Sequence, residues 1–403
     1  MTPDFLEASI AAAVAQEHWR LRDCEEGGTI LNPRAFEKGR VVHVPPEDWT
    51  SGFHPGSLWL LLELSGDEAW RPIAKRHSAA IEEAKRVTWH HDTGFMVQCG
   101  FGNGHRMGET TYADIMVEAA RSLAMRFRPA AGVIQSWDTG SGWMATRGWE
   151  CPVIIDNMMN LELLMNATII SGDPVFAKIA RSHADTTLER HYRSDGSCFH
   201  VVDFRLADGA VRSRETAQGA SDASAWDRGQ AWGVYGFAVM HRFTGEGRYL
   251  ERSLASLDFI ERHPRYPADG VPFWDFDAPG LDKNGLAGMG GKGGEPRDAS
   301  AAAILASALY ELSDQTGSHC RDWADRILCS LGSPGYRAAT GTNGGFFLLH
   351  STGSLPHGRE IDVPLNYADY YYLEALCRRK RLYEGRPAVD RPSSDPRENA
   401  KCQ

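Results

Sequence analysis

The sequence repeats one local signal along most of its length: an apolar segment ends at a glycine, and a polar residue then opens an amphipathic segment. The glycines that carry this signal are Gly66, Gly108, Gly172, Gly245 and Gly317. Glycine readily adopts the left-handed conformation that ends many helices, and an acid or serine near the next N-terminus complements the helix dipole. The repeated signal therefore predicts an array of helical hairpins.

Two kinds of helix alternate in the expected array. Residues 153–170 are apolar almost all round and rich in Leu, Ile and Met, which predicts a buried helix. The segments that follow the glycines are apolar on one face only, as expected for helices that cover the buried ones. The other segments that we expect to be buried are 57–64, 92–101, 226–243, 300–312 and 367–376.

Six hairpins of this kind predict an all-α (α/α)6 barrel, a toroid in which a ring of inner helices is surrounded by a ring of outer helices. An open helical solenoid is the alternative. We favour the closed barrel because the acids and tryptophans gather in the loops before the inner helices. One rim of a ring would collect these residues into a single pocket.

Composition narrows the domain organisation and the class of protein. Residues 1–385 are predicted to form a single catalytic domain, and residues 386–403, with Pro, Ser, Asp and Arg, a disordered tail. No apolar run is long enough to cross a membrane, and a net charge of −10 with dispersed basic residues argues against nucleic-acid binding. The eight scattered cysteines indicate free thiols. Without an export signal, we expect a cytoplasmic monomer or homodimer.

Two aspartates are candidates for acid catalysis. Asp92 opens an expected inner helix, and Asp156 lies inside the apolar segment 153–170. In a barrel they would fall on neighbouring inner helices at the same height. Burial and a second carboxylate both raise a carboxyl pKa, so such a pair can hold a proton near neutral pH. Taken singly, either aspartate could instead be a helix N-cap.

A second group of polar and aromatic residues lies downstream. His200 is followed by a loop of small residues that starts near Gln218 and reaches Trp226, Arg228 and Trp232 at a helix start. Arginine offers a planar fork to a carboxylate, and tryptophan offers a flat face on which a sugar ring can lie. The alternative interpretation is a surface Arg–Asp pair beside tryptophans of the core.

We expect neither a metal nor a cofactor. His90, His91 and Asp92 are adjacent in sequence, and adjacent side chains do not converge on one ion. The glycine-rich stretch 279–296 lacks the spacing of a phosphate-binding loop and follows no expected strand, which favours a lid or a plain loop. Serine and cysteine nucleophiles have no supporting motif.

Four blocks of sequence resemble one enzyme family. They are His-Asp-Thr-Gly-Phe at 91–95, Ile-Ile-Asp-Asn-Met-Met-Asn-Leu at 154–161, Trp-Asp-Arg-Gly-Gln-Ala-Trp at 226–232 and Asp-Tyr-Tyr-Tyr-Leu-Glu-Ala-Leu at 369–376. In this order they look like the unsaturated glucuronyl hydrolases of glycoside hydrolase family 88. The resemblance covers most of the chain and implies an (α/α)6 barrel, in agreement with the hairpin array.

The resemblance also implies a reaction. Members of this family remove the unsaturated uronic acid that polysaccharide lyases leave at the non-reducing end of an oligosaccharide. They hydrate the double bond between carbons 4 and 5; a hemiketal forms at carbon 5, the ring opens and the glycosidic bond breaks. This route differs from direct attack at the anomeric carbon. The expected partner is therefore an unsaturated uronate-containing oligosaccharide, of the glycosaminoglycan type.

By resemblance, Asp156 is the general acid/base, and Asp92 positions it and keeps it protonated. The residues that match substrate-binding positions are His91, Trp49, Trp137, His200, Gln218, Trp226, Arg228, Trp232, Ser351 and Ser354. A lysine that follows the paired serines in some members is associated with sulfated substrates. Here Leu-Pro-His-Gly-Arg stands at 355–359, which leaves Arg359 as the candidate substitute.

Three other functions fit parts of the pattern. A related barrel hydrolase acting on unsaturated galacturonyl-rhamnose from pectin would use the same acids. A sugar epimerase would need paired histidine bases, and His200 has no evident partner in the sequence. A non-catalytic carbohydrate-binding protein would have little need of an acid buried in an apolar segment.

Overall fold

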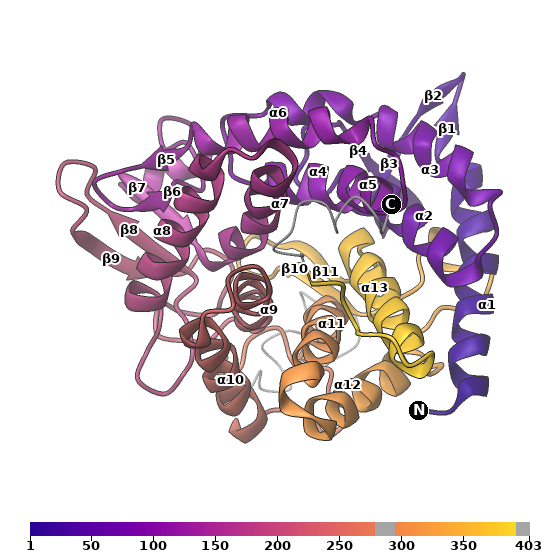
Figure 1. The fold of residues 1–403 in the computed structure, drawn as a ribbon. Coiled ribbons are helices and arrows are strands. Elements are labelled where there is room, and N and C mark those ends of the chain that lie inside the picture. The colour runs from indigo at the N-terminus through magenta and orange to yellow at the C-terminus, as the bar shows by residue number, and fades with distance from the viewer. Residues whose placement is uncertain (279–294, 392–403) are drawn as a thin grey trace.

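The computed structural model describes residues 1–278 and 295–391. Its helices form two concentric rings (Figure 1). The inner ring consists of α2 (Phe53–Ser65), α4 (Thr93–Val97) with its continuation α5 (Asn103–Arg106), α7 (Leu161–Ser171), α9 (Asp227–Thr244), α11 (Ala299–Thr316) and α13 (Asn366–Tyr383). The outer ring consists of α1 (Pro3–Arg20), α3 (Trp70–Ala79), α6 (Tyr112–Ala124), α8 (Pro174–Arg190), α10 (Gly247–Arg262) and α12 (Ser318–Leu331). The predicted (α/α)6 barrel is confirmed.

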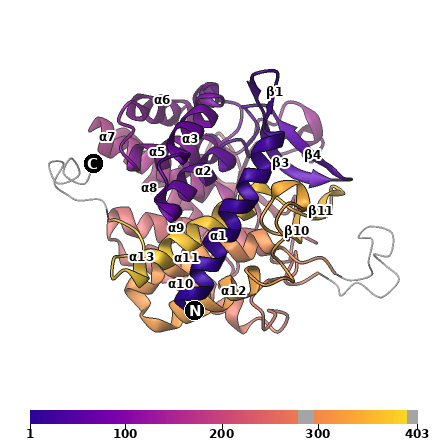
Figure 2. The ribbon, with the colours of Figure 1, turned by 90° about the vertical axis from the view of Figure 1, so that its right-hand side faces the viewer.

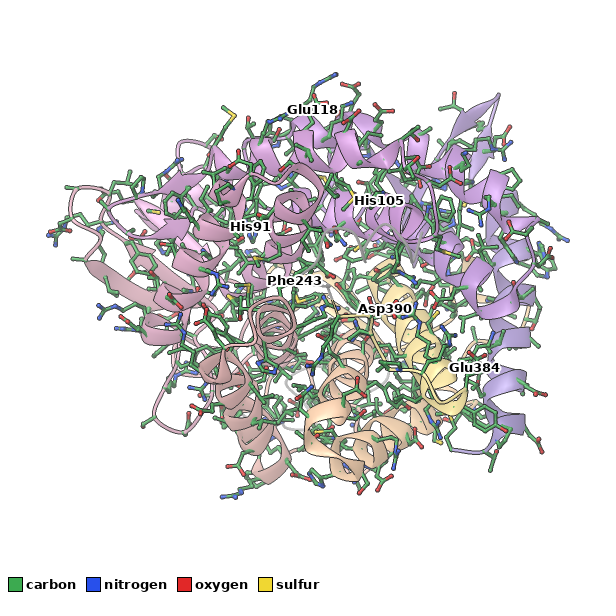
Figure 3. All side chains as sticks on the ribbon, viewed as in Figure 1. His91, His105, Glu118, Phe243, Glu384 and Asp390 are labelled. Atoms are coloured by element: carbon green, nitrogen blue, oxygen red, sulfur yellow. The ribbon has the colours of Figure 1, made fainter. Side chains whose placement is uncertain are left out.

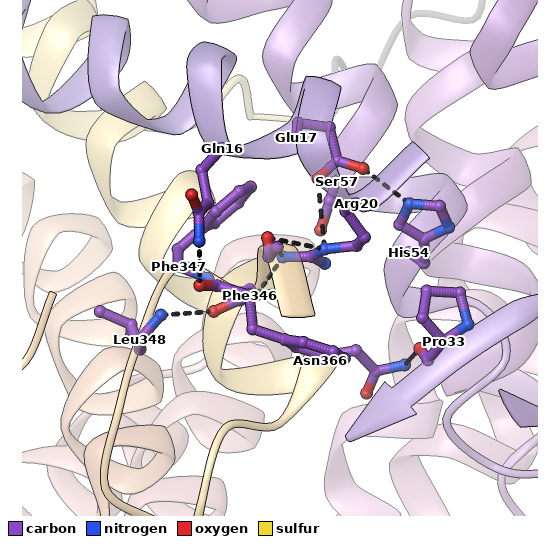
Figure 4. A network of polar contacts seen from close by, with 12 residues as sticks. Gln16, Glu17, Arg20, Pro33, His54, Ser57, Phe346, Phe347, Leu348 and Asn366 are labelled. Atoms are coloured by element: carbon purple, nitrogen blue, oxygen red, sulfur yellow. Dashed lines mark hydrogen bonds and ion pairs between the residues drawn. The ribbon is translucent and has the colours of Figure 1, made fainter. Parts of the chain in front are cut away.

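The ring is closed, and the open solenoid is therefore excluded. Helix α13 packs against both α11 and α2, so the last inner helix meets the first (Figure 1). Side chains fill the space within the ring (Figure 3). Helix α1 covers this junction from outside. Its Glu17 contacts His54 of α2 at 2.8 Å (Figure 4). Its Arg20 forms an ion pair with Asp369 of α13, and all four side chains are fully buried. The first and last helices are thereby joined.

Three of the five glycines end inner helices in the left-handed conformation, as predicted, whereas Gly317 ends α11 with φ 75° and ψ −147°, outside that conformation. Gly66, Gly172 and Gly245 follow α2, α7 and α9 with φ of 69°, 74° and 69°, and each amide donates to a carbonyl four residues earlier. A side chain at such a φ would be strained, which is why glycine stands there. The local signal in the sequence thus fixes where the inner helices stop.

Residues 153–170 do not form the single helix that their composition predicted. Residues Cys151–Ile154 are strand β7, residues Ile155–Asn160 form a 3-10 helix, and only then does α7 begin. Strand β7 pairs with β8 (Val201–Phe204), which pairs in turn with β9 (Val211–Glu215). The β-branched residues Val153 and Ile154 favour the extended conformation once a partner strand is available.

Short hairpins are inserted before several inner helices and were not predicted. Strands β3 and β4 precede α2, the three strands β7–β9 flank α7 and precede α9, and β10 and β11 precede α13. Figure 2 shows β3, β4, β10 and β11 together at one end of the barrel. Besides β7–β9, the bounds of the strands are β1 (Glu25–Glu26), β2 (Thr29–Ile30), β3 (Asn32–Glu37), β4 (Arg40–Val44), β5 (Phe127–Arg128), β6 (Val133–Ile134), β10 (Ser351–Ser354) and β11 (Arg359–Val363).

Several other predictions concern the chain as a whole. No helix in the described ranges is long and apolar enough to cross a membrane. Within the predicted tail, Ala388 is buried and Asp390 pairs with Arg381 at 2.9 Å, while residues 392–403 lie outside the described ranges. Most of the glycine-rich stretch, residues 279–294, also lies outside them. The division into one domain and a tail stays a prediction.

Candidate active site

A cavity of about 330 Å³ lies at the barrel end that carries the hairpins. Both candidate acids line it, together with residues from the segments that precede α2, α7, α9 and α13. The predicted site residues in its lining are Trp49, Asp92, Trp137, Asp156, Gln218, Arg228 and Ser354. The gathering of these positions at one rim follows from the inner helices sharing one direction, so that the loops before them meet.

Asp156 lies on the 3-10 helix between β7 and α7 and is 8% exposed. The backbone N–H of Ile155 donates to the carbonyl of His200 at 3.0 Å, which fixes the turn that presents Asp156 to the cavity. Burial, together with the negative charge of Asp92, raises the pKa of Asp156 to about 7 against the opposing charge of Arg228. A substantial fraction of this carboxyl group is therefore protonated at neutral pH.

Asp92 lies at the start of α4, but its side chain makes no capping hydrogen bond. Its Oδ1 is 3.2 Å from Nε2 of His91, and its Oδ2 is 3.1 Å from Nδ1 of His90. Burial by itself would raise the pKa of Asp92, but the two histidines outweigh it and lower the pKa. Asp92 is therefore the ionised partner of the protonated Asp156, and the N-cap interpretation does not describe its contacts.

His200 lies directly before strand β8, with its ring beside the carboxyl group of Asp156. Its Nδ1 accepts hydrogen bonds from the backbone N–H groups of Ala217 and Gln218 at 3.1 and 3.2 Å, so a neutral ring carries its proton on Nε2. That atom lies 3.8 Å from Oδ2 of Asp156. Burial, reinforced by the charge of Arg228, lowers the pKa of His200 well below its usual value. A neutral donor thus faces Asp156 in this arrangement.

Arg228 is held by partners on three sides. It forms an ion pair with Asp298 at 2.5 Å and donates to the carbonyl oxygens of Thr352 and Gly353, each at 2.6 Å. Gln218 donates to the same carbonyl of Gly353 at 3.0 Å. The guanidinium group therefore fastens the β10 strand to α9 while it lines the cavity, and it is not the surface Arg–Asp pair of the alternative interpretation.

The remaining predicted residues lie behind the cavity wall and do not line it: His91, His200, Trp226, Trp232 and Ser351. Figure 3 shows His91 within the ring of helices. Trp226 packs against the ring of His200, with centroids 4.5 Å apart, and Trp232 packs between Phe95 and Tyr371. These side chains support the residues that face the cavity.

Arg359, the candidate substitute for the lysine, lines the cavity. Sequence reasoning missed several other residues of the lining: Arg34, Trp143, His357, Glu360 and Tyr367. Arg34 on β3 forms ion pairs with Asp48 at 2.9 Å and with Glu360 on β11 at 2.5 Å. Nothing local in the sequence marks this pair, because its members are more than 300 residues apart and meet only through the barrel closure. Trp143 stands in a loop of tryptophans and glycines, and that composition is a signal that could have identified it.

No cluster of three or more His, Cys, Asp or Glu side chains converges on a metal position within residues 1–278 and 295–391. Both carboxylate oxygens of Asp92 point instead at the two histidines, which supports a role in acid–base chemistry. The described cysteines are all free thiols, and none lines the cavity.

Comparisons with known proteins agree with this geometry. No family model matches the sequence. The chain is 43% identical over 346 residues to the unsaturated glucuronyl hydrolase of Formosa agariphila, covering 85% of this chain and 82% of the relative. It is 34% identical over 353 residues to that of a Bacillus species, covering 84% and 88%. A crystal structure of an unsaturated glucuronyl hydrolase specific for heparin matches with a TM-score of 0.87 and 40% identity, over 96% of this chain and 100% of the other.

Proposed function

This chain belongs to the family of unsaturated glucuronyl hydrolases, which are glycoside hydrolases, and we propose that it removes the unsaturated uronic acid from the non-reducing end of lyase-generated glycosaminoglycan-type oligosaccharides. One observation carries this proposal. A buried carboxyl with a pKa of about 7, Asp156, shares a cavity with the ionised Asp92. That pair can give up a proton and take one back at neutral pH.

In the proposed reaction, Asp156 donates its proton to carbon 4 of the unsaturated uronic acid. The resulting positive charge is shared by carbon 5 and the ring oxygen, and water adds at carbon 5 while the Asp156 carboxylate accepts the proton of the water. The hemiketal at carbon 5 then opens to a ketone. Carbon 1 is left as a hemiacetal, which collapses to an aldehyde and releases the second sugar as an alcohol.

The neighbouring residues have distinct parts in this proposal. The charge of Asp92 keeps Asp156 protonated and stabilises the positive charge that develops around carbon 5. Nε2 of His200, which lies behind the cavity wall, donates to the Asp156 carboxylate. Gln218 and Arg228 hold the uronate and the polar groups of its ring, and Trp49 and Trp137 pack on its faces. A monomer or homodimer in the cytoplasm stays our expectation.

The proposal is tested by following the ultraviolet absorbance of the conjugated double bond. We expect the absorbance to fall when the protein is added to unsaturated disaccharides of the heparin, chondroitin or hyaluronan type. Asp156→Asn keeps the shape of the side chain and removes the acid, so turnover should fall by at least about 10²-fold. An unchanged absorbance with the wild-type protein across this panel would refute the function, and turnover of unsaturated galacturonyl-rhamnose alone would move it to pectin fragments.

A further inference from the structure

Two aromatic side chains from distant parts of the chain meet at the cavity mouth. Trp143 lies on a 3-10 helix (Gly142–Arg147), and His357 lies in the turn between β10 and β11. Their ring centroids are 5.1 Å apart, and both line the cavity that holds Asp92 and Asp156. Trp143 is 38% exposed, whereas each acid is 8% exposed. The two rings therefore lie at the outer part of the cavity, and the acids lie at its floor.

Trp143 belongs to a small aromatic wall. Its ring lies 5.4 Å from that of Trp137 and 5.8 Å from that of Trp149, and Trp137 stacks on Trp149 at an interplanar angle of 23°. Trp149 is buried and supports the other two, with the Arg147 guanidinium 4.6 Å from its ring centroid. Two supported indole faces thus remain at the cavity. Such faces suit the C–H side of a pyranose ring, which is apolar.

His357 supplies the polar edge of the same wall. Its Nδ1 lies 2.7 Å from Oγ of Ser354, so Ser354, a predicted substrate contact, is already engaged with this ring. Burial, with the charges of Arg359 and Arg147, lowers the pKa of His357, which keeps the ring neutral at neutral pH. A neutral imidazole has one further nitrogen for a hydrogen bond. That nitrogen can meet a hydroxyl or an amide of a sugar, and the uncharged ring does not attract the uronate away from the acids.

We propose that Trp143 and His357 select the sugar beyond the cleaved bond, with Trp143 packing on its pyranose ring and His357 hydrogen-bonding to one of its hydroxyl or amide groups. The inference rests on the proposed function, because it assigns the outer part of that site. The unsaturated uronic acid occupies the floor beside Asp156, and the second ring reaches the aromatic wall. The ligand class is a disaccharide whose second unit is a pyranose. A simple alkyl group in its place leaves the wall empty.

The test compares two substrates that share the unsaturated uronic acid: a disaccharide with a hexosamine as the second unit, and the methyl glycoside. For Trp143→Ala we expect kcat/KM on the disaccharide to fall about tenfold, mainly through KM, since one ring-stacking contact is lost. On the methyl glycoside we expect a change of less than about twofold. An equal loss on both substrates, or none on either, would overturn the inference.

Matched controls separate this role from a general effect. Trp19→Ala removes another exposed tryptophan, 42% exposed and outside the cavity lining, and should leave both substrates unaffected. His357→Ala should act on the disaccharide only, and the double variant with Trp143→Ala should lose less than the product of the two single losses, because the rings contact each other. Independent losses would contradict the shared wall. If wild-type protein turns over neither substrate, the proposed function itself fails.

Discussion

Nδ1 of His90 lies 3.1 Å from Oδ2 of Asp92, on the side of the carboxylate opposite to His91. Nε2 of the same ring lies 3.1 Å from the backbone carbonyl of Glu47. A carbonyl can only accept, so the ring donates there through Nε2. In the neutral ring Nδ1 accepts from the backbone N–H of Asp92 at 3.2 Å, and once the ring is protonated Nδ1 donates to Oδ2 of Asp92. Burial lowers the pKa of His90, but the hydrogen bond and charge of Asp92 outweigh it and raise the pKa. Asp92 is thus clamped between two imidazoles.

This clamp predicts how the acidic limb of the activity profile responds to His90→Gln. The charge on His90 holds the pKa of Asp92 down, so its loss raises that pKa. Because Asp92 acts as a carboxylate above its pKa, activity should disappear at a higher pH than in the wild type, by about one pH unit. The measurement is kcat/KM across acidic to alkaline pH. His319→Gln, an exposed histidine paired with Glu261, should leave the profile unchanged; a uniform loss for His90→Gln without a shift would contradict the clamp.

A second prediction concerns the alkaline limb. Asp156 acts as a proton donor, so activity should fall as pH rises through its pKa of about 7. The charge of Asp92 helps to raise that pKa, so Asp92→Asn should move the alkaline limb to lower pH as well as reduce kcat. The limb is read from initial rates of absorbance loss at saturating disaccharide. An alkaline limb that stays in place in Asp92→Asn would show that the two carboxyl groups are not coupled.

A third prediction concerns the cavity wall at Gly353. A Cβ atom on this residue would lie 2.3 Å from Oε2 and 2.7 Å from Cβ of Glu360, far inside contact distance. Gly353→Ala should therefore lower the free energy of unfolding by about 1–3 kcal/mol and displace the Arg34–Glu360 pair. Urea denaturation measures the loss. In the background of Glu360→Gly the same substitution should cost much less, and an equal cost in both backgrounds would rule out this contact.

A fourth prediction concerns the closure of the ring. Arg20 and Asp369 are both fully buried, and Arg20→Met would leave the Asp369 carboxylate without its ion-pair partner. Breaking a buried pair in this way costs about 3–5 kcal/mol. The surface pair of Arg262 with Asp258, whose side chains are 79% and 52% exposed, should cost less than about 1 kcal/mol on Arg262→Met. Similar denaturation midpoints for the two variants would contradict the role of Arg20 in joining α1 to α13.

The sequence predicted the parts of the structure that are encoded locally. Glycines such as Gly66, Gly172 and Gly245 end helices through their own backbone freedom, and the apolar or amphipathic character of each segment sorts it into the inner or the outer ring. The number of hairpins predicted the barrel. The acids and tryptophans in the loops before the inner helices predicted a single pocket at one rim, which holds Asp92 and Asp156. Each of these signals lies within a few residues of the feature it specifies.

Only the tertiary structure decided the features that depend on partners distant in sequence. The apolar run at 153–170 reads as one helix, yet its first residues pair with β8, and that strand is what places Asp156 on a turn. The Arg34–Glu360 pair and the Trp143–His357 contact form because the closed ring brings separate hairpins to one end. A sequence fixes which side chains a segment carries, whereas the pKa of a carboxyl and the lining of a cavity depend on what packs against them, and that is set by the fold.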